Sequence, residues 1–594
     1  MLHAYSRMAI SANHVMHWVV RIFLISAIST LLLLYYVSVA QENASKSAAQ
    51  IMHKQETIME GIRRKKLEQL RKVMFIKPLR PEGYVYNLDA EKSEQIPLIR
   101  EVPDTRPMEC RSMYYDTSKL SKFSIIIPFH NEALSMLLRT VHSFLARSPA
   151  TLLKEIIMID DASKNEDLKE LLEKYVKLLA KVRLLRTTRR EGLIRARMIG
   201  AAVAKAPVLF FVDAHTEANV GWAEPLLDEL RRNPRLVLQP HLDHIDPATI
   251  DYVKSSGTVP RGGFSWDLRF VWMKMPEHEK RRRRKDTEPV RMPVLVGCAI
   301  MVRKDYFLEL GAFDEGMNVW GGENIELSFR TWLCGGQVLS LPCSRIAHAF
   351  KEFHYSFDGD KETIVTRNLL RIAHLWMDDY KKFFLASTYS YDYKRTYLEE
   401  KDIISLEKRQ QLKNKLNCKP FHWYLHNIVP EIHVPPIETV YHGEVKNAES
   451  KACWYVKKDK YIGVTYNCFH HRLIPENMFE INVHSLMMHS HEGQDCIRMD
   501  HENHLLYVGE CPDTPESEHW RVKRKGPSSG LLRLYLGPED EKEVYCISQV
   551  TNVNSPHKGQ QMPQAVPCDS TNQFQYWEFT YKFEFDYNFD PPAT

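Results

Sequence analysis

Four short apolar runs, rich in β-branched and aromatic residues, alternate with helical patterns in the first half of the chain. The runs cover 123–128, 155–159, 182–185 and 208–212, and the helical patterns cover 137–146 and 168–179. Largely apolar runs of this length are typical of strands that are buried on both faces of a sheet. Their alternation with helices predicts an α/β fold with a mostly parallel sheet.

Polar residues directly follow three of these runs. They are His130-Asn131-Glu132, Asp160-Asp161 and Asp213-Ala214-His215. Ligands of open α/β sheets bind beyond the carboxyl ends of the strands, where such residues gather. The sequence therefore predicts a ligand site formed by these three segments.

The chain continues well beyond this region, and its 594 residues are too many for one compact domain. From about residue 452, short strand patterns and paired cysteines replace the α/β pattern. Three similar blocks begin at Cys453, Cys496 and Cys546, which indicates an internal repeat. The expected boundaries are 104–433 for the α/β domain, 434–449 for a linker and 450–585 for the repeat domain.

The N-terminal region contains an apolar run at 22–40 that is about long enough to span a bilayer. We expect an uncleaved signal anchor, with a cytoplasmic tail at 1–17, a transmembrane helix at 18–40 and a luminal stem at 41–103. The alternative is a cleaved signal peptide, because Ser38-Val39-Ala40 resembles a cleavage site. Either interpretation places the bulk of the chain in the secretory lumen or outside the cell.

The eleven cysteines agree with an oxidising compartment. None forms a tight Cys-x-x-Cys pair, and Cys453 and Cys468 have the same spacing as Cys496 and Cys511. This pattern indicates a disulfide framework, with one cysteine left over by the odd count. The formal charge of +5 is small for this length and does not by itself suggest nucleic-acid binding.

Asp213 and His215 are candidate metal ligands. Residues i and i+2 of an extended chain point the same way, so both side chains can reach one ion. A carboxylate and an imidazole suit Mn²⁺, which would neutralise a diphosphate leaving group. His348 is the candidate third ligand. A chance Asp-x-His and a histidine of the core remain alternatives, because spacing alone does not exclude them.

The segment Trp320-Gly321-Gly322-Glu323-Asn324 is a second candidate site. Its two glycines let the backbone approach a ligand closely. Trp320 can stack on a sugar or a base, and acidic side chains can bond sugar hydroxyls. A purely structural Gly-Gly turn is the alternative.

Motifs spread over about 104–431 resemble those of the polypeptide N-acetylgalactosaminyltransferase family. In chain order they include His130-Asn131-Glu132-Ala133, Arg189-Arg190-Glu191-Gly192-Leu193, Asp213-x-His215-x-Glu217, Gly262-Gly263-Phe264-x-Trp266, Trp320-Gly321-Gly322-Glu323-Asn324, Trp332-x-Cys334-Gly335-Gly336 and Cys418-Lys419-Pro420-Phe421.

The resemblance implies a Golgi membrane protein with an A-type glycosyltransferase fold, a nucleotide-binding α/β sandwich. Its expected activity is the transfer of N-acetylgalactosamine from UDP-GalNAc to protein Ser/Thr hydroxyls, with retention of configuration. Carried over by position, Asp213, His215 and His348 would bind Mn²⁺. The expected substrate-binding residues are His130, Asp161, Arg190, Gly192, Gly297, Lys351, His354 and Tyr355, and the expected catalytic residues are Trp320, Glu323 and Asn324.

Two departures from the family pattern leave alternatives open. Cys298 replaces a glycine in the strand of the sugar pocket, and the segment 351–357 has Lys351 for the usual arginine and lacks the usual proline. One alternative is a catalytically weak or inactive protein that binds UDP-sugar or glycoprotein in the Golgi. Another is a different donor, such as UDP-GlcNAc or UDP-Gal.

The repeat domain resembles a ricin-type β-trefoil lectin, with Gln575-Tyr576-Trp577 as its signature. Sugar-binding repeats carry an aspartate two residues after the first cysteine, where this chain has Tyr455, Arg498 and Ser548. We therefore expect weak or absent sugar binding. By resemblance, the expected disulfides are Cys110–Cys343, Cys334–Cys418, Cys453–Cys468, Cys496–Cys511 and Cys546–Cys568, with Cys298 free.

Overall fold

A computed structural model provides the structure of the protein. It describes residues 88–255, 260–351, 357, 359–389, 398–432, 434, 439–466, 468, 479–482, 487–489, 495–511, 520–525, 531–536, 545–553 and 557–582. Within these residues, every helix is too short or too polar to cross a membrane. The expected tail and signal anchor, and the stem up to residue 87, lie outside the described residues.

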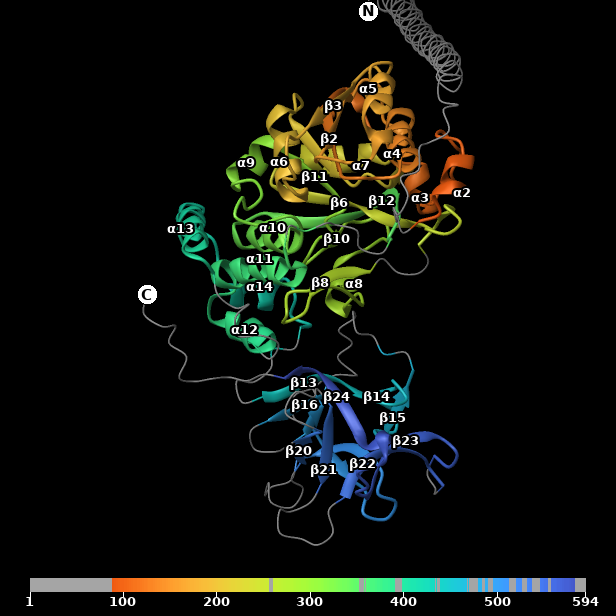
Figure 1. Cartoon of the computed structure of the whole chain (residues 1–594), viewed down its shortest axis with the longest axis vertical. Helices are drawn as coiled ribbons and strands as arrows, with labels where there is room; N and C mark the ends of the chain where they lie inside the picture. Colours follow the sequence, from red (N-terminus) through yellow and green to blue (C-terminus); the bar gives the residue numbers. More distant parts are fainter. Residues whose placement is uncertain are drawn as a thin grey trace, which may run out of the picture. The chain divides into compact units, whose positions relative to one another are not determined.

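A ten-stranded sheet organises the first part of the described chain, in the order β10-β12-β6-β11-β4-β1-β2-β3, with β5 beside β12 and β7 beside β6 (Figure 1). Its strands are β1 (Phe123–Phe129), β2 (Leu153–Asp160), β3 (Val182–Arg186), β4 (Val208–Val212), β5 (Thr216–Ala218), β6 (Leu236–Ile245), β7 (Tyr252–Val253), β10 (Val290–Arg291), β11 (Ala299–Arg303) and β12 (Gln337–His348). The four apolar runs of the sequence form β1 to β4, and β1 and β4 are buried along their whole length.

The expectation of a mostly parallel sheet is wrong, because the sheet is mixed. Strands β1 to β4 pair in parallel, as do β6 and β12. However, β11 runs antiparallel to both β4 and β6, and β5, β7 and β10 also pair antiparallel. Strand β11 is therefore inserted antiparallel between β4 and β6, which run in the same direction as each other.

The order β3-β2-β1-β4 places a topological switch point between β1 and β4. Connections on the two sides of such a point leave the sheet in opposite directions, which opens a crevice at the carboxyl ends of the strands. The segments after β1 and β4 therefore frame a ligand site.

Helices connect and cover the strands. They are α2 (Ala90–Gln95), α3 (Met108–Arg111), α4 (Leu134–Arg147), α5 (Glu170–Val176), α6 (Leu193–Val203), α7 (Ala223–Arg232), α8 (Glu277–Arg282), α9 (Lys304–Glu309), α10 (Glu323–Leu333), α11 (Lys361–Trp376), α12 (Lys381–Tyr389), α13 (Glu400–Lys415) and α14 (Phe421–Asn427). The helices α10, α11 and α14 lie together (Figure 1), and they share a core with the hairpin of β8 (Arg261–Phe264) and β9 (Phe270–Met273).

Part of the expected stem belongs to this fold. The helix α2 packs on α4, where the Arg139 guanidinium donates to Ser93 Oγ over 2.9 Å. Arg100 donates to both carboxylate oxygens of Glu217, at 3.0 and 2.6 Å. The sequence around these residues is polar, and its docking depends on these distant partners, so no local pattern revealed it.

The second part of the chain forms a nearly closed antiparallel sheet of β13 to β24. Its strands are β13 (Thr439–Asn447), β14 (Cys453–Val456), β15 (Ile462–Thr465), β16 (Phe479–Asn482), β17 (Met487–His489), β18 (Asp495–Met499), β19 (Leu506–Glu510), β20 (Trp520–Arg524), β21 (Leu532–Leu536), β22 (Tyr545–Thr551), β23 (Gln561–Pro567) and β24 (Tyr576–Lys582). Strand β13 falls within the expected linker but pairs with β14, β16 and β24, so this part of the linker belongs to the sheet.

Three hairpins of this sheet reproduce the repeat that the sequence indicates. They are β14–β15, β18–β19 and β22–β23, and each has a disulfide-bonded cysteine as the first or second residue of its first strand. Trp520 and Trp577 each donate their indole N–H to the carbonyl oxygen of the residue after the first cysteine of their repeat, Ile497 and Ile547. The structure contains all five disulfides that the resemblance implied, and Cys298 is free and buried.

Candidate active site

A cavity of about 550 Å³ opens at the carboxyl ends of β1 and β4, at the switch point of the sheet. Its lining contains most of the residues that the sequence singled out, namely His130, Asp161, Arg190, Asp213, His215, Gly297, Trp320, Glu323, Asn324, His348 and Lys351. His354 and Tyr355 lie outside the described residues. Residues separated by more than 200 positions in sequence thus meet in one hollow.

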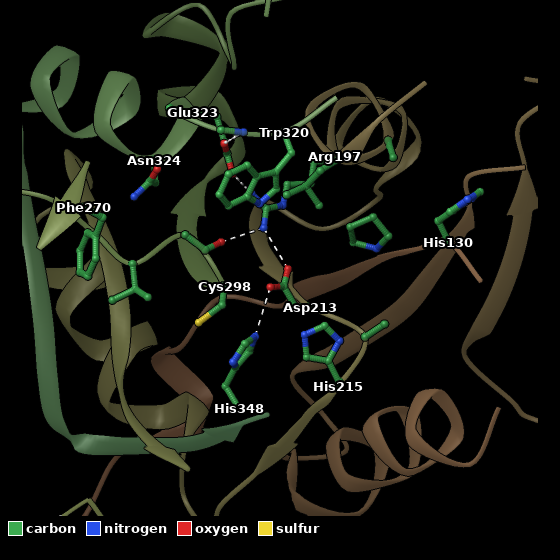
Figure 2. A pocket seen from close by; sticks show the side chains of 18 of the residues that line it. His130, Arg197, Asp213, His215, Phe270, Cys298, Trp320, Glu323, Asn324 and His348 are labelled. Atoms are coloured by element: carbon green, nitrogen blue, oxygen red, sulfur yellow. Dashed lines mark hydrogen bonds and ion pairs between the residues drawn. The ribbon is translucent and has the colours of Figure 1, made fainter. Parts of the chain in front are cut away.

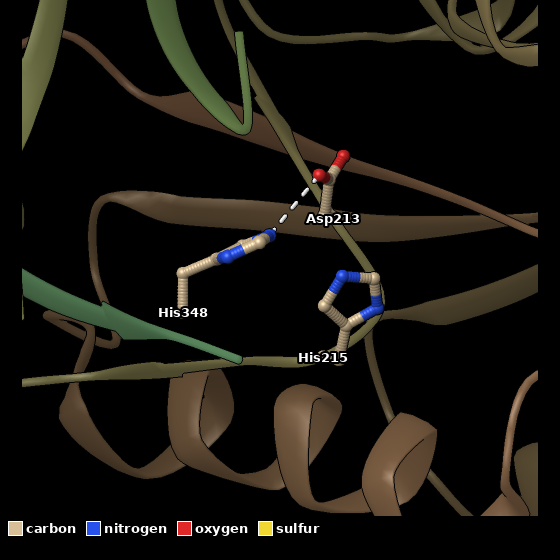
Figure 3. A group of neighbouring side chains, drawn as sticks. All are labelled: Asp213, His215 and His348. Atoms are coloured by element: carbon tan, nitrogen blue, oxygen red, sulfur yellow. Dashed lines mark hydrogen bonds and ion pairs between the residues drawn. The ribbon is translucent and has the colours of Figure 1, made fainter. Parts of the chain in front are cut away.

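The three candidate metal ligands meet in this cavity. One ligand atom from each of Asp213, His215 and His348 lies within 4.8 Å of the others. His348 Nε2 is 3.3 Å from Asp213 Oδ2, and Figure 3 shows the His215 ring beside the same carboxylate. Asp213 and His215 follow β4, whereas His348 ends β12, which pairs with β5 through Thr216.

The donor set fits a divalent cation. One carboxylate and two imidazoles suit Mn²⁺ and similar borderline ions. Burial lowers the pKa of His348 to about 4, so its ring is neutral and able to bind a metal at neutral pH. Its Nδ1 is buried and has no hydrogen-bond partner among the described residues. A cation held between the three side chains would replace the direct contact of His348 with Asp213.

Glu132 supports the metal-ligand cluster from the loop after β1. Its Oε2 accepts a hydrogen bond from His215 Nδ1 over 2.8 Å, and Lys351 Nζ donates to both of its oxygens at 2.7 and 2.8 Å. Burial alone would raise the pKa of the Glu132 carboxyl, but the charge of Lys351 and the hydrogen bonds from Lys351 and His215 hold this pKa well below its usual range. Glu132 is therefore an ionised, almost fully buried carboxylate.

Asp161 organises a second wall of the cavity. It accepts hydrogen bonds from the backbone N–H groups of Glu191 at 2.7 Å and Gly192 at 2.8 Å, and it forms an ion pair with Arg190. Gly192 has φ = +86°, and a Cβ there would come within 2.4 Å of Val319 Cα, so only glycine fits. His130 Nδ1 lies 2.7 Å from the Asp161 carbonyl oxygen, and burial lowers its pKa to about 4.

Arg197 of α6 lies between the three candidate metal ligands and Glu323 at the start of α10, as Figure 2 shows. Its Nη2 donates to Asp213 Oδ1 at 3.1 Å and to the Gly297 carbonyl oxygen at 2.7 Å, and its Nη1 lies 3.4 Å from Glu323 Oε1. Only 1% of the Arg197 side chain is exposed, so its charge is balanced by these two carboxylates.

The third wall is the start of α10 with the turn before it. Glu323 is buried, and its Oε2 accepts from the backbone N–H of Gly321 at 3.1 Å. Asn324 Nδ2 donates to the Leu295 carbonyl oxygen at 2.9 Å. Gly322 caps α10 in the left-handed region, so the chain can turn sharply before the helix. Trp320 and Glu323 therefore reach the cavity from the same short turn.

Cys298 lines the cavity directly beside the metal-ligand cluster. Its carbonyl oxygen accepts a hydrogen bond from the Asp213 N–H at 3.0 Å. Burial, and then the charge of Asp213, raise the pKa of the Cys298 thiol well above its usual value. The thiol is therefore neutral and acts in the cavity wall through its volume.

Sequence reasoning assigned no role to two of these residues, Glu132 and Arg197. Glu132 belongs to the family motif at 130–133, but the resemblance implied no contact for its side chain. The signal for Arg197 was present, because it lies on the apolar stripe of α6 with Leu193, Ala196 and Gly200, all of which are buried. A charge on such a stripe needs a buried partner, which indicates a polar site nearby.

The mixed sheet and the metal-ligand cluster at its switch point define an A-type glycosyltransferase. A family profile described as "Glycosyl transferase family 2" matches residues 124–311, and one described as "N-terminal domain of galactosyltransferase" matches 281–355. The crystal structure of GalNAc-T7 with UDP, GalNAc and Mn²⁺ superposes with a TM-score of 0.59 and 29% identity, over 86% of this chain and 92% of that one.

Similar proteins of known name show to which family of glycosyltransferases the chain belongs. Human polypeptide N-acetylgalactosaminyltransferase 3 is 41% identical over 82% of this chain and 75% of its own length. The human transferase 6 is 37% identical over 84% of this chain and 78% of its own length. The chain belongs to the polypeptide N-acetylgalactosaminyltransferase family.

Proposed function

We propose that this protein transfers N-acetylgalactosamine from UDP-GalNAc to Ser/Thr hydroxyls of proteins, in a Mn²⁺-dependent reaction that retains the anomeric configuration. The observation that carries the proposal is the meeting of Asp213, His215 and His348 at the switch-point cavity of a member of this family. GalNAc-T7, which shares this fold, holds UDP, GalNAc and Mn²⁺ in its crystal structure.

Side chains on different walls of the cavity would bind different parts of the substrate. Asp213, His215 and His348 would hold Mn²⁺, which when bound supplies positive charge to the diphosphate leaving group. His130, Asp161, Arg190 and Gly192 would bind the nucleotide. Gly297 and Lys351 would contact the donor, and His354 and Tyr355 remain predicted substrate-binding residues.

Trp320, Glu323 and Asn324 would bind the sugar and the acceptor. Both oxygens of Glu323 have partners, Arg197 Nη1 and the Gly321 N–H, so the carboxylate is held in one orientation. We assign it to fixing the donor sugar against the incoming hydroxyl. Such pre-oriented charges stabilise a transition state without having to reorganise during the reaction.

A transfer assay with the full-length protein in detergent tests the proposal. Donors would be UDP-GalNAc, UDP-GlcNAc and UDP-Gal, and acceptors would be Ser/Thr peptides paired with the same peptides carrying Ala instead. We expect product only from UDP-GalNAc and only with hydroxyl-bearing peptides. UDP binding without product would support the inactive alternative, and transfer from another donor would contradict the proposed substrate.

Cys298→Gly is expected to relax the choice of donor. The substitution removes the side chain from the cavity wall beside Asp213, and one group of this size is worth about tenfold in discrimination. The ratio of kcat/KM for UDP-GalNAc to that for UDP-GlcNAc should fall accordingly. Cys298→Ser, which keeps the volume, is the control and should leave the ratio near that of the unaltered protein. If this ratio is the same in Cys298→Gly as in the unaltered protein, Cys298 has no part in donor selection.

We further propose that β13 to β24, which extend the expected domain of residues 450–585 at its start, form a β-trefoil that has lost its sugar sites. Support comes from the three disulfide-bonded hairpins and from Ser548, which is fully buried at a position where a sugar-binding repeat needs an accessible carboxylate. In the absence of UDP, millimolar GalNAc should give no heat of binding in a calorimetric titration. Saturable binding in that titration would contradict the loss of the sites.

We also propose a Golgi location, with the run 22–40 as the membrane anchor and the catalytic domain in the lumen. The apolar run and the family resemblance support it. The five disulfides agree with folding in an oxidising compartment. Protection of the catalytic domain from protease in sealed Golgi vesicles would test the orientation, and digestion without detergent would contradict it.

A further inference from the structure

Glu132 connects three segments of the chain at the edge of the metal-ligand cluster. Its own loop follows β1, His215 follows β4, and Lys351 follows β12. Besides the bonds to His215 and Lys351, Glu132 Oε1 accepts from the Ala133 N–H at 3.0 Å. Only 6% of the side chain is exposed, so solvent does little to stabilise the charge and these donors must do so.

The contact with Glu132 determines which nitrogen of His215 is available. An ionised carboxylate only accepts hydrogen bonds, so His215 Nδ1 carries the proton in this 2.8 Å contact. The lone pair of the neutral ring then lies on Nε2. Rotation of the ring would break the Glu132 bond, so the carboxylate also fixes the orientation of the ring.

Lys351 makes this arrangement possible. A buried carboxylate with one imidazole partner would be poorly compensated, and Lys351 Nζ lies within 2.8 Å of both Glu132 oxygens with 12% of its side chain exposed. The two contacts leave the carboxylate with a single orientation. Carboxylates that bond the second nitrogen of a metal-bound histidine in this way raise metal affinity in other proteins.

We propose that Glu132 is a positioning residue for the metal site, which holds His215 with Nε2 directed toward Asp213 and His348 and is itself neutralised by Lys351. The inference rests on the proposed metal-dependent function. It adds that Mn²⁺ affinity depends on a carboxylate that does not itself touch the ion.

The test measures Mn²⁺ binding directly, through loss of the free-ion EPR signal in the presence of UDP, on full-length variants. Glu132→Ala should weaken Mn²⁺ binding by about 10- to 100-fold. Glu132→Gln should have an intermediate effect, because its amide oxygen can still accept from His215 Nδ1 but cannot neutralise Lys351. It also carries the test if Glu132→Ala fails to fold. Transfer assays should show the loss mainly as a raised KM for Mn²⁺, with kcat largely restored at saturating metal.

Glu155→Gln is the matched control. Glu155 is also a buried carboxylate with a cationic partner, Arg183 at 2.9 Å, but it lies near the amino end of β2, away from the cavity. The Mn²⁺ affinity of the Glu155→Gln variant should equal that of the unaltered protein. Binding by both Glu132 variants within twofold of the unaltered protein would overturn the inference, as would an equal loss in the control. Failure of the unaltered protein to bind Mn²⁺ would instead overturn the proposed function.

Discussion

Asp213→Ala is expected to reduce transfer by roughly a thousandfold or more. The substitution removes the only carboxylate of the metal-ligand cluster and also the partner of Arg197 Nη2. Electrostatic stabilisation of a departing diphosphate by a bound cation is worth several kcal/mol, and each 1.4 kcal/mol is a factor of about ten in rate. The measurement is kcat/KM for a Ser/Thr peptide with UDP-GalNAc and Mn²⁺.

Asp305→Ala is the control for that prediction, because Asp305 is an exposed acid away from the cavity, and it bonds its neighbours Arg303 and the Tyr306 N–H. It should retain full activity. EDTA should reproduce the loss in the unaltered protein, and added Mn²⁺ should reverse it. Activity of Asp213→Ala within tenfold of the unaltered protein would disprove the metal-ligand assignment.

Arg197→Met is expected to lower both activity and stability. Methionine approximates the volume of the arginine stem but leaves Asp213 and Glu323 without their shared cation. Loss of one partner of a buried ion pair costs about 3–5 kcal/mol, because the remaining charge stays buried. Thermal and denaturant unfolding should show the stability loss, and kcat/KM should fall even at temperatures where the variant is folded.

Arg195→Met provides the comparison on the same helix. Arg195 bonds Asn318 Oδ1 at 2.7 Å from a partly exposed position, and none of its bonds reaches the cavity. Its loss should cost less than about 1 kcal/mol. Equal destabilisation by the two variants would show that Arg197 has no special place between the two carboxylates.

The first half of the sheet was predictable because each of its strands is an apolar run that can be recognised from the local sequence. A run such as Val208–Val212 is buried on both faces and can hardly be anything else. The second half was not predictable by this route. Strands β6 and β12 contain Pro240 and Pro342, which argue against strands, and β12 shifts its register against β6 between Leu341 and Arg345. The antiparallel insertion of β11 depends on contacts with β4 and β6 that no local pattern contains.

The site was predictable to a similar degree. Asp213 and His215 are close in sequence, so their spacing alone suggested a shared ion. His348 lies 135 positions from Asp213, and it was a candidate third ligand whose spacing did not exclude a core histidine until the family resemblance assigned it to the same ion. The supporting residues Glu132 and Arg197 owe their roles to partners on other elements, and such roles become visible only when the chain is folded.

The disulfide between Cys110 and Cys343 joins residues 233 positions apart, and Cys343 lies on β12 five residues before His348. A covalent tether across so long a loop removes much freedom from the unfolded chain, worth about 5 kcal/mol in chain-entropy terms. The strand that carries His348, a proposed metal ligand, is thus held by a bond that forms only in an oxidising compartment. Protein produced in a reducing cytosol would have the correct sequence but would lack the Cys110–Cys343 disulfide, so β12 and the cavity that it borders would be less stable.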